Sequence, residues 1–247
     1  MVDGVTTPPL AAHRGLALWA ALCCWVGGVL IGVHYAGRTD LGPLDGAITR
    51  TLSAVVGNPK PLGKWAVIPP TVPTRVLGAL SNPVLIYAVI AAVLVFAVWR
   101  RRWEVAALVV LAPGLCALVT EVSKPWFGRY HDGYLSYPSG HMATSAAALT
   151  VGLLAVTGGW AGRRRVFAMA GWALVVFCTA AGLVAMNYHY PSDVAGGFLL
   201  ALGVVLPGAV LADSVSSWRS RRPAAARPAG TPHADTSSEI RRPAAPR

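Results

Sequence analysis

A histidine and an aspartate stand where they could attack an ester or move a proton. His189 and Asp193 have i,i+4 spacing, which places both side chains on one face of a helical turn. A carboxylate bonded to one imidazole nitrogen fixes the tautomer and leaves the other nitrogen free as a nucleophile or a base. An equally good interpretation of this pair alone is an interfacial histidine beside an aspartate that caps a helix.

A second histidine follows a Ser-Gly turn in the motif Pro138-Ser139-Gly140-His141. Glycine lets the backbone approach an anion closely, and the free N–H groups at a helix N-terminus attract phosphate. His141 would then stand beside the bound group, where it could protonate a departing oxygen. A simple helix cap formed by Ser139 is the alternative for this motif.

Two cations precede this motif and suit an anionic ligand. Arg129 offers a planar fork for phosphate oxygens, and Lys124 offers a point charge. Snorkelling toward a membrane interface is the alternative for isolated cations, and Glu121 is near enough in the chain to pair with Lys124. The histidines, cations, carboxylate and Ser-Gly turn are together the parts needed to hold a phosphate and cleave it.

The elements that would position these residues are hydrophobic. The chain is 55% hydrophobic and 13% charged, whereas a soluble domain has about 25% charged residues. About 20 apolar residues cross a bilayer as a helix, so we predict an all-α, six-span transmembrane helical bundle over residues 15–213. The second span begins near Pro83, because proline favours a helix start over a helix interior. The charge-free runs are residues 15–37, 76–99, 105–120, 142–162, 166–188 and 194–212.

The first run is also compatible with a cleaved signal peptide. Its apolar stretch exceeds the typical signal core of about 7–15 residues, and no small-residue cleavage site follows, so we expect a retained anchor. The four cysteines fall inside apolar runs, and no Cys/His spacing suggests a metal site.

The distribution of charge predicts the orientation of the bundle. The net charge is +11, and the arginines gather at 100–102, at 163–165 and from 219 onward, each group after an even-numbered span. Short loops rich in arginine stay in the cytoplasm, so both termini are expected inside the cell and the three motifs outside, at the plasma membrane. This pattern marks topology and attraction to anionic lipid heads and argues against a nucleic-acid partner.

The regions outside the spans have distinct compositions. Residues 1–14 form a short polar cytoplasmic segment. The external loop 38–75 contains an amphipathic pattern at 44–56, which predicts a helix that either lies on the membrane surface or packs on the outer ends of the spans. Residues 214–247 are rich in arginine, proline and alanine, which predicts a disordered basic cytoplasmic tail.

Together these motifs resemble the type 2 phosphatidic acid phosphatase (PAP2) superfamily, in its membrane lipid phosphatase branch. The resemblance implies that His189 attacks phosphorus to form a phosphohistidine, that Asp193 orients it, and that His141 protonates the leaving group. It also implies that fixed cations and amides stabilise the transition state, so that no metal or cofactor is needed. The implied phosphate-binding residues are Lys124, Ser139 and Gly140.

The family pattern has three motifs: first Lys, six residues and Arg-Pro; second Pro-Ser-Gly-His; third Ser-Arg, five residues, His, three residues and Asp. The chain departs from this pattern at two places. The Arg-Pro of the first motif falls at His131-Asp132, where Arg129 could substitute through a loop shift. The Ser-Arg of the third motif falls at Gly182-Leu183, which removes one phosphate-binding charge. His131 or Asn187 could partly compensate for that loss.

The favoured interpretation is an integral-membrane phosphatase that hydrolyses a lipid phosphate or diphosphate, polyprenyl or glycerolipid, at the extracytoplasmic face. Its partners would be the lipid substrate and the bilayer. The missing arginine motivates an alternative, a non-catalytic lipid-phosphate binding or transport protein. Vanadate-dependent halogenation, the chemistry of soluble relatives, is disfavoured by the membrane spans.

Overall fold

The structure, a computed structural model, describes residues 9–11, 13–56, 71–80 and 82–221. Eight helices occur in this part, with a short hairpin between the fifth and sixth. Their bounds are α1 (Arg14–His34), α2 (Gly42–Val55), α3 (Val72–Leu80), α4 (Pro83–Trp99), α5 (Trp103–Phe127), β1 (Tyr130–His131), β2 (Tyr134–Leu135), α6 (Gly140–Thr157), α7 (Gly162–Ala185) and α8 (Pro191–Arg221). The predicted features within residues 1–8, 57–70 and 222–247 lie outside the described residues.

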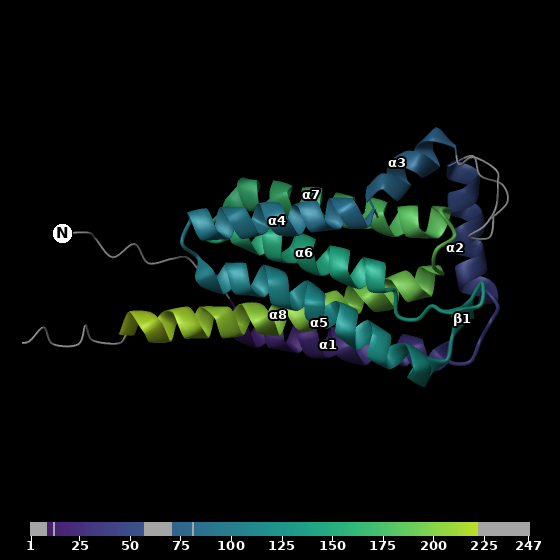
Figure 1. Cartoon of the computed structure of the whole chain (residues 1–247), viewed down its shortest axis with the longest axis horizontal. Coiled ribbons are helices and arrows are strands. Elements are labelled where there is room, and N and C mark those ends of the chain that lie inside the picture. Colours follow the sequence, from purple (N-terminus) through teal and green to yellow (C-terminus); the bar gives the residue numbers. More distant parts are fainter. Residues whose placement is uncertain (1–8, 12, 57–70, 81, 222–247) are drawn as a thin grey trace, which may run out of the picture.

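The long helices run side by side along the length of an elongated bundle, and α2, α3 and the hairpin gather at one end (Figure 1). The helices α1, α5, α6, α7 and α8 are each long and apolar enough to cross a membrane. The pair α3 and α4 completes a sixth candidate span, bent by 42° at its break. The predicted all-α six-span bundle is therefore confirmed, and the short hairpin and the separate helix α3 are additions to it.

The break between α3 and α4 follows from local chemistry. Asn82 caps α4 by accepting a hydrogen bond of 2.9 Å from the Val84 N–H, and Pro83 occupies the first turn. Proline has no N–H and disfavours a helical residue before it, so a continuous helix stops here. The predicted start of this span near Pro83 is confirmed, and α3 becomes a separate helix at the end of the bundle that carries the hairpin.

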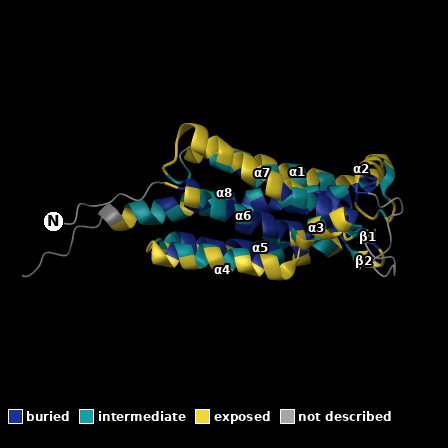
Figure 2. Cartoon of the chain, turned by 90° about the horizontal axis from the view of Figure 1, so that it is seen from above, coloured by how far each residue is buried: buried dark blue, intermediate teal, exposed yellow. Residues whose placement is uncertain are grey.

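Small residues allow α6 to occupy the centre of the bundle, where it packs against α4, α5, α7 and α8. Alanines line its buried faces, among them Ala143, Ala146 and Ala147. Figure 2 shows burial concentrated where the helices face each other, whereas the outward faces of α4 and α7 are exposed. Those faces carry large apolar side chains such as Phe167 and Phe177, which suits contact with lipid.

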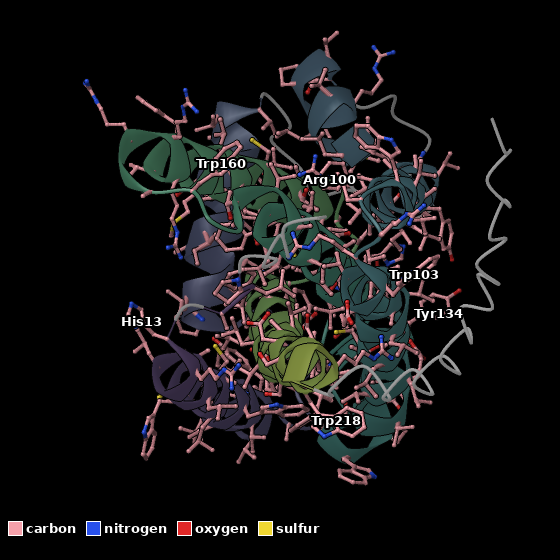
Figure 3. The ribbon with its side chains drawn as sticks, turned by 90° about the vertical axis from the view of Figure 1, so that its left-hand side faces the viewer. His13, Arg100, Trp103, Tyr134, Trp160 and Trp218 are labelled. Carbon is pink, nitrogen blue, oxygen red and sulfur yellow. The ribbon has the colours of Figure 1, made fainter. Side chains whose placement is uncertain are left out.

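Aromatic residues mark the end of the bundle opposite the hairpin. Trp103, Trp160 and Trp218 come from three different segments and spread around that end, together with Arg100 (Figure 3). All three tryptophans are exposed. Tryptophan prefers the membrane–water interface, so these side chains indicate where the hydrocarbon core ends.

The helix α2 confirms the predicted helix at 44–56 within two residues of each boundary and has an unexpected orientation. Its buried residues are polar or small and include Asp45, Thr49 and Ser53, whereas Leu44 and Val55 are exposed. The helix thus packs on α7 and α8 through its polar face and turns its apolar face away from the bundle. This arrangement is compatible with both predicted alternatives. The polar face of α2 packs on the spans, and its apolar face is free to contact a membrane surface.

The last helix is longer than predicted, because α8 continues to Arg221 instead of ending before residue 214. Contacts to other segments stabilise its final turns. Both Asp213 carboxylate oxygens accept backbone N–H groups, from Leu10 and Ala11, at 2.8 Å. Arg219 pairs with Glu104 of α5 at 3.1 Å. The start of the proposed tail therefore moves beyond Arg221.

Candidate active site

A cavity of about 1280 Å³ opens at the end of the bundle that carries α2, α3 and the hairpin. Segments far apart in the chain supply its walls: α3, the outer end of α5, the hairpin, the first turn of α6 and the connection from α7 to α8. Its lining includes most of the titratable residues named from the sequence, together with one additional arginine: Arg75, Lys124, His131, His141 and His189.

The two histidines of the separate motifs face this one cavity. His141 stands in the first turn of α6, and His189 lies in the connection before α8. Their ring centroids are 6.2 Å apart, and the rings are tilted by 55° to one another. At this separation both rings can reach one phosphoryl group bound in the cavity, one as an attacking nitrogen and the other as a proton donor.

Asp193 lies behind His189 and is fully buried. Its Oδ2 atom is 3.8 Å from the His189 Nδ1 atom and also accepts the Tyr190 N–H at 3.2 Å. The Nδ1 atom is buried and has no hydrogen-bond partner among the described residues. Catalytic hydrogen bonds are often long without substrate, so Asp193 is placed to hold Nδ1 and leave Nε2 for the cavity.

Arg129 does not reach the cavity, contrary to its predicted role as a phosphate ligand. The guanidinium is fully buried, donates to Asp193 Oδ1 at 2.9 Å and to Asp45 Oδ2 at 2.6 Å, and contacts the Ser192 hydroxyl. It also lies between the rings of Tyr35 and Tyr190, 4.3 and 4.6 Å from their centroids. Two carboxylates already neutralise this cation, so its structural role is to fix Asp193.

Asp45 is the counterpart of Arg129 and was missed as a site residue by sequence reasoning. Its carboxylate accepts the Ser192 backbone N–H at 2.9 Å and the Ser192 hydroxyl at 2.6 Å, in addition to the guanidinium. We call Asp45, Arg129, Ser192 and Asp193 the buried network. The one available signal was the position of Asp45 on a polar stripe with Thr49, opposite the apolar face of α2.

Lys124 lies in the last turn of α5 and lines the cavity. Its ammonium group pairs with Glu121 at 2.5 Å, which confirms the pairing suggested by their spacing. The pair lies near the C-terminal end of α5, where the helix dipole also favours a cation.

Ser139 joins the second motif to the third. The buried Ser139 hydroxyl caps α6 by accepting the Met142 N–H at 3.3 Å, and the Ser139 N–H donates to the Asp193 carbonyl at 3.0 Å. Ser139 and Gly140 do not line the cavity in this structure. A Cβ atom on Gly197 would overlap the Ser139 carbonyl oxygen, so glycine is required for this close approach of α8.

His131 links the hairpin to the connection before α8. Its Nε2–H donates to the Asn187 carbonyl at 2.8 Å, and its ring packs against Tyr190 at 4.3 Å between centroids. Burial raises the pKa of Tyr190, so its hydroxyl stays protonated and donates to the Thr39 carbonyl at 3.1 Å. Both His131 and Asn187 line the cavity.

Comparisons with known proteins identify the family and the fold. A profile described as the PAP2 superfamily matches residues 45–214. The fold resembles a solved structure described as the first transmembrane PAP2 type phosphatidylglycerolphosphate phosphatase from Bacillus subtilis, with a TM-score of 0.62 and 16% sequence identity. The match covers 83% of this chain and 100% of that chain. No curated protein matches significantly.

Proposed function

Because the chain belongs to the PAP2 superfamily, we propose that it is an integral-membrane phosphatase acting on a lipid phosphate. The substrate would be a phosphomonoester or diphosphate with a polyprenyl or glycerolipid chain, hydrolysed at the extracytoplasmic face. The observation that carries the proposal is the pair of imidazoles, His141 and His189, 6.2 Å apart on one cavity, with a buried carboxylate behind His189.

The proposed reaction has two steps. The His189 Nε2 lone pair attacks phosphorus, and the bond from phosphorus to the lipid oxygen breaks. His141 gives a proton to the departing oxygen, and Asp193 accepts the Nδ1–H of the positively charged phosphohistidine. Water, deprotonated by His141, then attacks phosphorus, and inorganic phosphate leaves with the His189 nitrogen restored.

In the proposed reaction, a lysine and backbone N–H groups of the protein stabilise the charge of the phosphoryl group. Lys124 stands in its wall, and the N–H groups in the first turn of α6 begin at the same place as His141. Cations and helix N-termini that are already oriented lower the energy of a transition state with developing negative charge. We therefore propose that catalysis does not require a metal.

The position of the cavity supports a substrate anchored in the bilayer. It opens at one end of the bundle beside exposed apolar faces, so a hydrocarbon chain could stay in the membrane while its head group enters. Arg100 lies at the other end with the exposed tryptophans (Figure 3), and residues 163–165 stand in the first turn of α7, shortly after Trp160 in the chain. By the positive-inside rule, that end would be cytoplasmic and the cavity extracytoplasmic.

The test uses the purified chain in detergent, with a chelator present, on a panel of polyprenyl and glycerolipid phosphates. We expect phosphate release by the wild type and a loss of about a thousandfold or more for His189→Ala, the scale of removing a nucleophile. His34→Ala is the matched control, because His34 is exposed near the same end and lies outside the cavity.

A labelled phosphoryl group should also remain on the protein in an acid-labile form, and should be absent from His189→Ala. Release that persists in His189→Ala would assign the nucleophile elsewhere. Binding of every lipid phosphate without any release by the wild type would favour the alternative of a non-catalytic binding protein. Release that stops with the chelator would contradict metal independence.

A further inference from the structure

The helix α3 brings an arginine to the cavity from outside the three motifs. Arg75 lies on α3 and lines the same cavity as His141 and His189. One turn later, a Cβ atom on Gly78 would stand 3.0 Å from the Met186 side chain, so α3 packs closely on the end of α7. Met186 also lines the cavity. This contact holds α3, the helix that carries Arg75, against the end of α7 that follows Gly182-Leu183 in the chain.

That segment supplies no cation. Leu183 is fully buried in the hydrophobic core and does not line the cavity. Arg129, the arginine after α5, is buried and already bonded to two carboxylates. Among the described residues, an arginine that reaches a phosphate in the cavity must therefore come from another helix.

Arg75 differs from Lys124 in having no acidic partner among the described residues. The formal charges of Arg75 and Lys124 are balanced by those of Glu121 and Asp132 while the histidines are neutral. Lys124 is paired with Glu121 at 2.5 Å. Within the described residues, by contrast, no hydrogen bond or ion pair involves the Arg75 guanidinium.

We propose that Arg75 binds the phosphoryl group of the substrate, in place of the cation that the third motif lacks. A guanidinium can donate two parallel N–H bonds to phosphate oxygens, which a lysine cannot do. Arg75 from α3 and Lys124 from α5 would hold the group from two walls while the histidines act on it. The inference rests on the proposed function, since it names a further ligand of the same phosphoryl group.

The first experiment measures equilibrium binding of inorganic phosphate to the purified full chain in a neutral detergent. We expect Arg75→Ala to weaken binding about tenfold or more, the loss associated with a hydrogen bond to a charged group. Arg75→Lys should recover part of that loss, because it keeps the charge without the fork. Arg50→Ala is the control, since Arg50 is exposed on α2 and does not line the cavity.

Arg75→Gln provides a second, nearly isosteric variant, and thermal melting shows whether each variant is folded. In the lipid phosphate assay, we expect Arg75→Ala to raise KM more than it lowers kcat. Unchanged phosphate binding in folded Arg75→Ala and Arg75→Gln would overturn the inference, as would a wild type that binds no phosphate.

Two further outcomes separate the inference from its premise. Weakened phosphate binding in Arg75→Ala, in a chain that hydrolyses no lipid phosphate, would support the Arg75 site and contradict the proposed function. A variant that lost only its association with phosphatidylglycerol vesicles, with phosphate binding intact, would assign Arg75 to lipid heads and overturn the inference.

Discussion

Lys124 and Arg129 lie close together in the chain at the C-terminal end of α5, but the two side chains have different surroundings. Lys124 lines the cavity and has one acidic partner, Glu121. Arg129 is fully buried, bonded to two carboxylates and enclosed by two aromatic rings. Both cations suit a phosphate by residue type. The number of counter-charges and the access to the cavity decide which one is available to a ligand.

The physical reason lies in desolvation. A guanidinium removed from water needs partners of opposite charge and hydrogen bonds for its protons, and the buried network supplies both. A lysine at the edge of a cavity keeps part of its hydration and can exchange one partner for another. We therefore expect changes in the buried network to reduce folding stability and changes in the cavity wall to reduce turnover.

The largest effect on stability is expected for Arg129→Ala. It leaves Asp45 and Asp193 buried side by side without their shared cation, which should reduce the free energy of unfolding by about 3–5 kcal/mol. Denaturant unfolding in detergent measures this, with Arg50→Ala as a control for the loss of an exposed arginine. A folded variant of unchanged stability that had lost phosphate binding would restore Arg129 as a ligand.

A smaller loss is expected for Asp45→Asn, because Asp193 still pairs with Arg129. The amide keeps the shape but weakens the bonds to the guanidinium and to Ser192, so unfolding should become easier by about 1–3 kcal/mol. The exposed Asp40→Asn is the matched control. Equal stability of the two variants would show that α2 does not hold the network.

Gly197→Ala tests the contact that brings the second motif to Asp193. The new methyl group would overlap the Ser139 carbonyl oxygen, and such overpacking costs about 1–3 kcal/mol. Gly140→Ala should cost less, since its methyl group would meet the Thr120 hydroxyl at 3.3 Å. Melting temperatures of the two variants give the comparison, and a more stable Gly197→Ala would contradict the close approach.

The smallest effect on stability is expected for Lys124→Ala, because a surface ion pair contributes only about 0–1 kcal/mol. Its kcat/KM should nevertheless fall by an amount equivalent to about 1.5–3 kcal/mol, the value of a hydrogen bond to a charged group. Glu121→Gln is the control, since it frees Lys124 and should preserve turnover. If Lys124→Ala lost stability but kept its turnover, Lys124 would be a structural cation and the contrast with Arg129 would be wrong.

Several features of the chain could be predicted from local sequence. The apolar runs reveal the spans, Pro83 marks a helix start, and Ser139 marks a cap, because hydrophobic length, proline geometry and capping depend on neighbours in the chain. Convergence of His141 and His189 at one end followed from the alternating direction of the spans. The motif of His141 and the motif of His189 come together because both follow or precede spans that end on the same side.

Other features depend on segments far apart in the chain. The partnership of Asp45 with Ser192, the burial of Arg129 and the position of Arg75 in the cavity wall have no local signature. The polar face of α2 turns inward because it meets a buried cation there, against the ordinary expectation for an amphipathic helix. Sequence determined which segments enter the membrane and at which end the polar motifs meet. The tertiary structure decided which charges are desolvated together, because that depends on contacts between helices and not on spacing within one.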